Sequence, residues 1–225
     1  FLETCFDNNL KNIIFSSTAA VYGNTNNKVK ENYKKKPLNP YASSKLELEN
    51  FIKNSSKIHK SKFIILRYFN VAGSDRLMRT GLISKRSTHL IKIISEVVVG
   101  KRKVLKIYGD NYDTPDGTPI RDFVHVSDLA DIHLLVMKHL LSGGNSEIYN
   151  CGYGKGYSVM DVVKKVDEIQ NIKLKFKISS RRPGDSKFVV SNTNKFMKAF
   201  NWKPKYNNLR KILQSSIDWE KKIKN

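Results

Sequence analysis

Two short apolar runs on either side of a long amphipathic segment set the strongest limit on how this chain folds. Residues Ile13–Phe15 and Phe63–Leu66 are continuously apolar, as strands buried on both faces of a parallel sheet are. Between them, Asn39 and Pro40 suit the cap and the first position of a helix that runs towards Lys60. Because parallel strands need a crossover of this kind, the unit predicts an α/β fold.

The same alternation continues along the chain. Apolar residues at helical spacing predict helices over Leu90–Val98 and from an N-cap at Ser127. Residues Ile148–Cys151 indicate a further buried strand, and Ser158 with Asp161 forms a capping box for the next helix. These elements extend the α/β pattern towards the C-terminal end of the sequence.

A smaller second lobe is indicated by two short strands at Leu105–Ile107 and Phe176–Ile178, which are embedded in turn-rich sequence. The 225 residues suffice for one large domain or for two unequal ones. We therefore expect one main sheet and a smaller lobe beside it.

Three glycines between a predicted strand and a predicted helix superficially match a dinucleotide-binding turn. Gly152, Gly154 and Gly156 are followed by Tyr157, where that turn needs a glycine. No acidic residue ends a strand about twenty residues later, where the ribose partner belongs. We interpret the segment as a structural turn.

Composition limits where the protein works. No run approaches the about 18 apolar residues that span a bilayer, and the first residues match no targeting signal. Cys5 and Cys151 lie far apart and form no metal-binding pattern, which fits a reducing cytoplasm. We expect a soluble cytoplasmic protein with no membrane partner and no metal. Four histidines also lack metal-ligand spacing: His59, His89, His133 and His139.

The formal net charge of +21 raises the alternative of a nucleic-acid-binding protein. Lysine supplies 32 of the 41 basic residues and is scattered, whereas phosphate-reading surfaces favour arginine. The one dense run, Lys34–Lys36, lies in a polar stretch that we interpret as a solvated loop. Nucleic acid is therefore not an expected partner, and a steep loss of affinity with salt would reveal it. Nucleotide-sized anions stay open as partners.

The segment PYASSK, residues 40–45, places Tyr41 and Lys45 four positions apart at the start of the first predicted helix. Such positions share a helix face, yet about 1.4 pairs of this kind arise by chance in this composition. A core tyrosine beside a surface lysine is therefore an open alternative. The segments FSSTAAVYG (15–23) and LRYFNVAG (66–73) each follow a predicted parallel strand, where ligands bind.

With these segments the sequence resembles the extended short-chain dehydrogenase/reductase family, most closely its UDP-glucose 4-epimerases. The resemblance covers nearly the whole chain. Five ordered segments carry it: Thr18 within SSTAAVYG, Tyr41 with Lys45, RYFN at Arg67–Asn70, DGTPIRDFVHVSDLAD at Asp116–Asp131, and RRPGD at Arg181–Asp185.

The resemblance implies the fold class. It is α/β, the C-terminal part of a doubly wound parallel-sheet, Rossmann-type domain with a smaller α/β substrate-binding lobe. The family's glycine-rich NAD-binding units do not precede Phe1, so we interpret the chain as an N-terminally truncated fragment. Alone, it is expected to bind NAD weakly and to be inactive. The expected parts are the NAD-binding domain at residues 1–75, segments near 123–152 that return to it, and the lobe at 76–122 and 153–225.

Oxidation of a sugar hydroxyl needs a base for the proton while hydride leaves the carbon. A phenol of ordinary pKa, about 10, is mostly protonated near neutral pH, and an ammonium about 4 Å away supplies on the order of 4 kcal/mol towards ionising it. The resemblance makes Tyr41 this base and Lys45 this ammonium, with Lys45 also on the nicotinamide ribose. Thr18 would hold the reacting hydroxyl, and Phe69 would contact the nicotinamide of NAD through its backbone.

The resemblance also implies contacts to a UDP-sugar substrate. Arg121 and Arg182 would pair with the diphosphate, whose oxygens suit guanidinium forks. Asn70 would donate to the diphosphate, Tyr108 would stack on uracil, and Asp185 would accept from the ribose hydroxyls.

Structural roles are alternatives for some of these residues. Arg121 has a possible salt-bridge partner in its neighbour Asp122, and Arg182 fits a solvated loop. His125, in the segment FVHV, is interpreted as a structural histidine and not as a base.

The implied function is interconversion of UDP-glucose and UDP-galactose by transient oxidation at sugar C4. Dehydratases of the family carry an acidic pair where Ala19 and Ala20 stand, and methyl groups transfer no protons, which favours an epimerase. Other NAD-dependent epimerases or decarboxylases, acting on UDP-N-acetylglucosamine or UDP-glucuronate, stay open. An inactive sugar-nucleotide binder would lack the trio Thr18, Tyr41 and Lys45, and this chain keeps all three. Val189 matches a sugar-pocket position where a small side chain would admit an N-acetyl group. Homodimers are usual in the family.

Overall fold

The computed structural model describes residues 1–84 and 86–224. Its helices are α1 (Leu2–Asp7), the 3₁₀ helix η1 (Ala19–Tyr22), α2 (Pro40–Ile58), α3 (Leu90–Val98), α4 (Val126–Leu141), α5 (Val159–Gln170), α6 (Asn194–Phe200) and α7 (Leu209–Lys222). Its strands are β1 (Asn12–Thr18), β2 (Lys62–Tyr68), β3 (Asn70–Ala72), β4 (Leu105–Tyr108), β5 (Ile120–His125), β6 (Glu147–Cys151), β7 (Gly156–Ser158), β8 (Phe176–Ser179) and β9 (Phe188–Val189).

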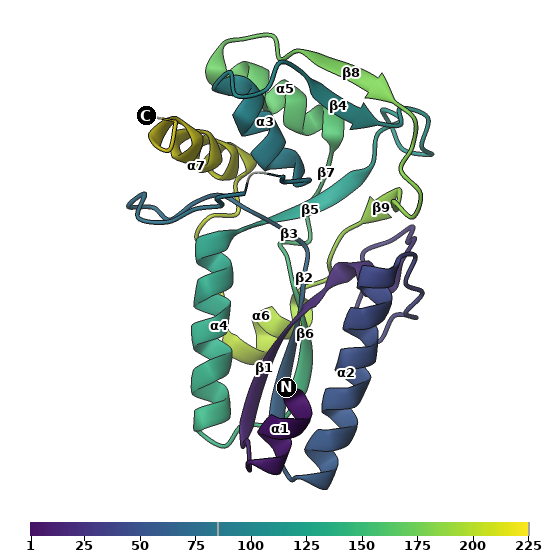
Figure 1. The fold of residues 1–225 in the computed structure, drawn as a ribbon, viewed down its shortest axis with the longest axis vertical. Helices are drawn as coiled ribbons and strands as arrows, with labels where there is room; N and C mark the ends of the chain where they lie inside the picture. The colour runs from purple at the N-terminus through teal and green to yellow at the C-terminus, as the bar shows by residue number, and fades with distance from the viewer. Residues whose placement is uncertain (85, 225) are drawn as a thin grey trace.

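A parallel sheet in the order β1-β2-β6 forms the lower half of the molecule in Figure 1. Helices α2 and α4 lie on opposite sides of this sheet, and α6 packs against β6. Residues 64–66 of the central strand are fully buried, which explains their unbroken apolar run. This arrangement is the parallel α/β fold that the sequence predicts.

Helix α2 begins where the sequence indicates. The Asn39 side chain accepts a hydrogen bond from the backbone N–H of Ala42 at 2.9 Å, and Pro40 occupies the first turn. The start of α2 is thereby fixed beside the ends of β1 and β2, and Tyr41 lies in its opening turn.

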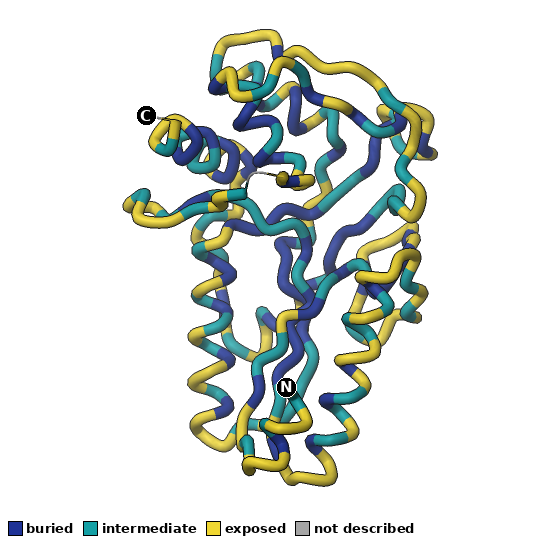
Figure 2. The backbone as a smooth tube through the Cα atoms, in the orientation of Figure 1, coloured by how far each residue is buried: buried dark blue, intermediate teal, exposed yellow. Residues whose placement is uncertain are grey.

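The upper half contains the parallel pair β4 and β8 with helices α3, α5 and α7, as Figure 1 shows. Strand β5 crosses between the halves and pairs with β3, β7 and β9. Buried residues, dark blue in Figure 2, follow the strands and recur along the helices. The largest buried cluster runs through both halves and includes Leu66, Val124, Ile132, Val163 and Ile217.

The cap of α4 differs from the expectation. The N-cap is His125, not Ser127, because the His125 Nδ1 accepts from the Ser127 N–H at 3.1 Å. The His125 ring is buried, stacks on Tyr206 and has its Nε2 3.2 Å from Ser215 Oγ. The interpretation of His125 as a structural histidine is confirmed.

The glycine-rich segment is a turn, as expected. Both carboxylate oxygens of the buried Asp122 accept from it, Oδ1 from Tyr153 N and Oδ2 from Gly154 N. A Cβ on Gly152 would lie 2.6 Å from Asp122 Oδ2, so glycine is needed for this close approach. The capping box of Ser158 and Asp161 then opens α5.

No helix within residues 1–84 and 86–224 is long and apolar enough to cross a membrane. Among the same residues, no group of three or more His, Cys, Asp or Glu side chains is arranged to hold a metal ion.

Candidate active site

Strands β1 and β2 end at the same level, because their register pairs Thr18 with Tyr68. Thr18 caps η1, with its Oγ1 accepting from the Ala20 N–H at 3.2 Å, which leaves the hydroxyl proton free to donate. Phe69 and Asn70 directly follow β2, and the Phe69 N–H donates to the Cys151 carbonyl at 3.1 Å. The Phe69 carbonyl is then the backbone group available to a ligand.

Helix α2 presents Tyr41 at this edge, and its side chain is 57% exposed. Lys45, one helical turn later, points to β1, where its Nζ donates to the Ser16 carbonyl at 2.9 Å and lies 5.0 Å from the Phe15 ring centroid. In the part of the chain that the structure describes, Tyr41 and Lys45 form no hydrogen bond with each other. The sequence places the pair on one helix, and the ammonium is held at the strand.

A cavity of about 420 Å³ opens at the strand ends; we call it the strand-end cavity. Side chains from β1, α2, the β2–β3 junction, β5 and the 184–189 segment converge on it. It is lined by seven residues that the sequence singles out: Thr18, Tyr41, Phe69, Asn70, Arg121, Asp185 and Val189. Ala19 and Ala20 are also in its wall. Residues far apart in sequence thus meet around one space.

A second cavity of about 290 Å³, the Tyr108 cavity, adjoins the first. Its wall includes Tyr108 and Arg182, and it shares Asn70, Arg121 and Asp185 with the strand-end cavity. Together the two cavities contain every predicted site residue among their described lining residues except Lys45.

Arg121 is paired with Asp185 and not with its neighbour Asp122. Arg121 Nη2 donates to Asp185 Oδ1 at 2.5 Å, whereas Asp122 is buried and accepts from Ser191 and the glycine turn. The alternative of an Arg121–Asp122 salt bridge is therefore wrong. Alternating strand residues point to opposite faces, so neighbours on β5 do not meet.

Arg182 lies over the ring of Tyr108, with 3.6 Å between its Cζ and the ring centroid. The adjacent Arg182 guanidinium also lowers the pKa of the Tyr108 phenol. One face of the ring that the sequence assigns to uracil is thus covered by a cation, and Arg182 is not free in a solvated loop.

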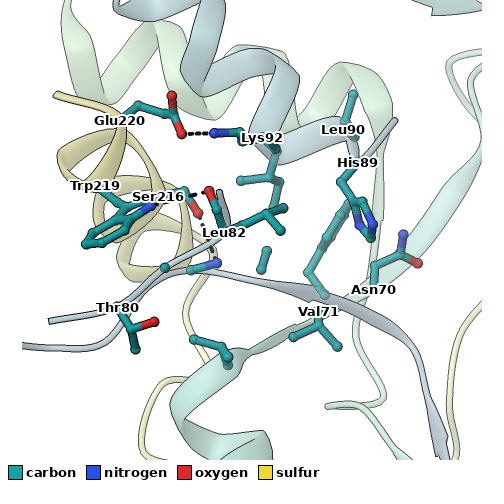
Figure 3. Close-up of a pocket in the computed structure, with 16 residues that line it drawn as sticks. Asn70, Val71, Thr80, Leu82, His89, Leu90, Lys92, Ser216, Trp219 and Glu220 are labelled. Atoms are coloured by element: carbon teal, nitrogen blue, oxygen red, sulfur yellow. Dashed lines mark hydrogen bonds and ion pairs between the residues drawn. The ribbon is translucent and has the colours of Figure 1, made fainter. Parts of the chain in front are cut away.

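Figure 3 shows a third cavity of about 340 Å³, lined in part by Asn70; we call it the Trp219 cavity. Val71, Leu90 and Trp219 make much of its wall apolar. It shares Asn70, Val71 and His89 with the strand-end cavity. Helix α7 closes one side, where Ser216 Oγ accepts from the Gly73 N–H at 2.9 Å.

Sequence reasoning missed His89 as a site residue. It is the N-cap residue of α3 and lines all three cavities. The sequence signal that could have indicated it is its place immediately before the apolar run that starts at Leu90, at the start of a predicted helix.

Comparison with known proteins decides the family. Residues 1–152 match the NAD dependent epimerase/dehydratase family. The chain belongs to this family. The chain is 42% identical to a UDP-glucose 4-epimerase of Azospirillum brasilense over 223 residues, which are 99% of this chain.

Solved structures of family members are similar throughout the chain. A UDP-glucose 4-epimerase of Bifidobacterium longum in complex with NAD+ and UDP superposes with a TM-score of 0.92 at 34% identity, covering 100% of this chain and 68% of that one. A UDP-Glc/GlcNAc 4-epimerase of Campylobacter jejuni gives a TM-score of 0.78 at 40% identity, covering 98% of this chain and 68% of that one. The fold is thus the parallel α/β, Rossmann-type fold of these epimerases. The chain spans 64% of the length of the Azospirillum relative.

Proposed function

We propose that this protein, at its full natural length, interconverts UDP-glucose and UDP-galactose with NAD as the hydride carrier. The observation that carries the proposal is the convergence of Thr18, Tyr41 and Asn70 on a cavity whose far wall holds Arg121 and Asp185. A proton-transfer group thus shares one space with a cation suited to a diphosphate. The UDP-glucose 4-epimerases among the relatives support the same activity.

Tyr41 is the group that exchanges the proton of the sugar 4-hydroxyl. Its exposure within the strand-end cavity gives a sugar access to the phenol. Thr18 has a free hydroxyl proton and orients the reacting hydroxyl towards Tyr41. With NAD bound to supply the redox chemistry, the strand-end cavity would leave the oxidised sugar room to turn over, and Tyr41 would return the proton to its 4-oxygen.

Lys45 is assigned to the nicotinamide ribose and to a hydrogen bond with the Tyr41 phenol in the loaded site. An ammonium carries three donors, and the Ser16 carbonyl takes one of them at 2.9 Å. The other two are available to Tyr41 and to the ribose. Its place beside β1 keeps the positive charge one helical turn from the phenol.

The residues present fit the nicotinamide end of NAD. The Phe69 carbonyl can accept from a carboxamide N–H, because its own N–H is already bonded to Cys151. NAD supplies the acceptor for the C4 hydride when it is bound. The other residues that line the strand-end cavity exclude water and hold the sugar at the ends of β1 and β2.

The nucleotide part of the substrate is assigned to the Tyr108 cavity. Arg121 and Arg182 pair with the diphosphate, Asn70 donates to it, and Asp185 accepts from the uridine ribose. Tyr108 stacks on uracil with the ring face that Arg182 leaves open. Asn70, Arg121 and Asp185 line both cavities, so they bridge the nucleotide and sugar ends.

A cytoplasmic homodimer is also proposed. The free thiols of Cys5 and Cys151 support a location in the reducing cytoplasm. The dimer is proposed from the family resemblance. Light scattering on the purified protein measures the assembly, and a monomeric mass would contradict the dimer.

The proposed reaction is tested by incubating the full natural-length protein and NAD separately with UDP-glucose, UDP-N-acetylglucosamine and UDP-glucuronate. UDP-galactose from the first substrate is the expected product. Formation of a product only from the second or third would support another epimerase or a decarboxylase in its place.

A further inference from the structure

We propose that the buried ion pair of Glu49 and Arg67 is a positioning device, which fixes the helix that carries Tyr41 and Lys45 against the two strand ends of the active site. This inference rests on the proposed function. Neither residue lines the strand-end cavity or the Tyr108 cavity among the described lining residues, so neither is a catalytic residue.

The pair joins α2 to β2 with a forked geometry. Arg67 Nε donates to Glu49 Oε1 at 2.9 Å, and Arg67 Nη2 donates to Glu49 Oε2 at 2.6 Å. The two side chains are 1% and 0% exposed. Two parallel hydrogen bonds between planar groups permit one relative orientation of helix and strand.

The same carboxylate also holds β1. Ser17 Oγ donates to Glu49 Oε1 at 2.5 Å, and Ser17 directly precedes Thr18. Arg67 in turn lies two residues before Phe69 on the other strand. Glu49 therefore links the helix of the proposed base to both strands whose ends form the strand-end cavity.

The other side of Arg67 is fully engaged as well. Its Nη1 donates to Tyr22 Oη at 2.9 Å and to the Glu31 carbonyl at 2.8 Å. Tyr22 Oη donates to Asn150 Oδ1 at 2.7 Å, and burial raises the pKa of Tyr22 to about 12, which keeps this donor proton in place. The guanidinium cannot shift without breaking its bonds to Tyr22 of η1 and to the Glu31 carbonyl.

Stability alone does not account for this arrangement. Burying two charges is costly, and well-packed apolar side chains of similar volume often stabilise a protein as well or better. An apolar pair, however, packs in several orientations, whereas a bidentate guanidinium–carboxylate pair permits only one. Tyr41 lies two helical turns before Glu49, so a small rotation of α2 moves the phenol relative to Thr18.

The test uses the full natural-length protein and four variants. Glu49→Gln and Arg67→Lys each break the fork, and the double variant E49L/R67M replaces the charges with apolar volume. Glu220→Gln is the matched control, because Glu220 is an equally buried partner of Lys92 and links α3 to α7. Thermal unfolding, kcat, KM for UDP-galactose and the pH dependence of kcat are measured for each.

A positioning role predicts a split between stability and turnover. The double variant regains the melting temperature that the single variants lose, yet its kcat stays about 10- to 100-fold below wild type, as misplacement of reacting groups predicts. KM changes by less than about threefold, because the diphosphate contacts lie on other elements. Glu220→Gln has a lower melting temperature than wild type but a wild-type kcat. The pH dependence of kcat changes in all three variants that break the fork and not in Glu220→Gln.

Wild-type kcat in the double variant would contradict the positioning role while leaving the proposed function standing. An equal loss of kcat in Glu220→Gln at the same loss of melting temperature would also contradict it, since the effect would then follow stability. If the wild-type protein turned over no UDP-sugar, the proposed function would fail first, and the positioning role with it.

Discussion

Arg121 and Asp185, 64 residues apart in sequence, form an ion pair in the wall shared by the strand-end and Tyr108 cavities. The pair sets the arginine beside the proposed diphosphate position before any ligand arrives. A preorganised cation loses less freedom on binding. Asp185 is thus the anchor of Arg121, in addition to its proposed role as an acceptor for the uridine ribose.

Asp185→Asn keeps the side-chain shape and removes the charge. We expect KM for UDP-galactose to rise about tenfold or more, with kcat changed less, because uniform binding is lost. Steady-state kinetics measure both. Asp113→Asn is the control, since Asp113 is 91% exposed and pairs with Lys187. An equal KM for the Asp185 variant and wild type would refute the assignment.

Adjacent arginines allow a matched comparison. Arg182 covers Tyr108 at 3.6 Å, and Arg181 covers Tyr112 at 4.1 Å. Arg182→Lys loses the planar fork and the stacking, so KM for the UDP-sugar should rise by about tenfold. Arg181→Lys should change KM by less than about twofold, because Arg181 is not among the described residues that line the Tyr108 cavity. Calorimetry should show that Arg182→Lys loses more affinity for UDP than Arg181→Lys does. Equal losses of affinity in the two variants would argue against the Tyr108 cavity as the nucleotide site.

We propose that Val189 sets the space available to the substituent at C2 of the sugar. It lies in the wall of the strand-end cavity, where a branched aliphatic side chain leaves more space than an aromatic ring. The wild-type protein is expected to turn over UDP-N-acetylglucosamine as well as UDP-glucose. Val189→Tyr should lower turnover of UDP-N-acetylglucosamine at least tenfold more than turnover of UDP-glucose, which corresponds to about 1.4 kcal/mol of discrimination. Parallel losses on both substrates would sink this prediction.

His125 makes stability depend on pH. Burial lowers its pKa below the ordinary 6.5, against the opposing charge of Asp128. The unfolded chain therefore binds a proton that the folded chain lacks, so the free energy of unfolding declines as pH falls through about 6.5. The imidazole stacks on Tyr206 and contacts Ser215, and its neutral Nδ1 is the cap acceptor of α4.

His125→Asn supplies a cap acceptor that does not titrate. Urea unfolding at about pH 7.5 and about pH 5.5 should show a smaller loss of unfolding free energy for this variant than for wild type. If both proteins lost the same amount, another group would be responsible.

Local signals predicted the elements well where one segment decides them. The N-caps of α2 and α5 could be predicted from adjacent residues alone, Asn39 with Pro40 and Ser158 with Asp161. The strands that contain Ile13 and Phe63 were predicted from their apolar runs. Ser127 failed as a cap because the acceptor is His125, two residues earlier, and that choice depends on Tyr206 and Ser215 from the far end of the chain.

The site divides in the same way. The strand-end argument placed segments 15–23 and 66–73 at one ligand-binding edge, since carboxyl ends of parallel strands share an edge. The roles of Thr18, Tyr41 and Asn70 came from the family resemblance, and all three line the strand-end cavity. The partner of Arg121 depends on the loop at Asp185, and sequence proximity pointed to Asp122 instead. Likewise, nothing in PYASSK says that Lys45 reaches the Ser16 carbonyl.

The most direct test of the account is the rate at which the full natural-length protein converts UDP-galactose to UDP-glucose, compared with its Tyr41→Phe variant and with Tyr33→Phe as an exposed tyrosine control. The account predicts that Tyr41→Phe lowers kcat by about 10²- to 10⁴-fold, as loss of a general base does, while UDP affinity and the Tyr33 variant stay near wild type. A Tyr41→Phe variant that turns over the sugar at close to the wild-type rate would contradict it.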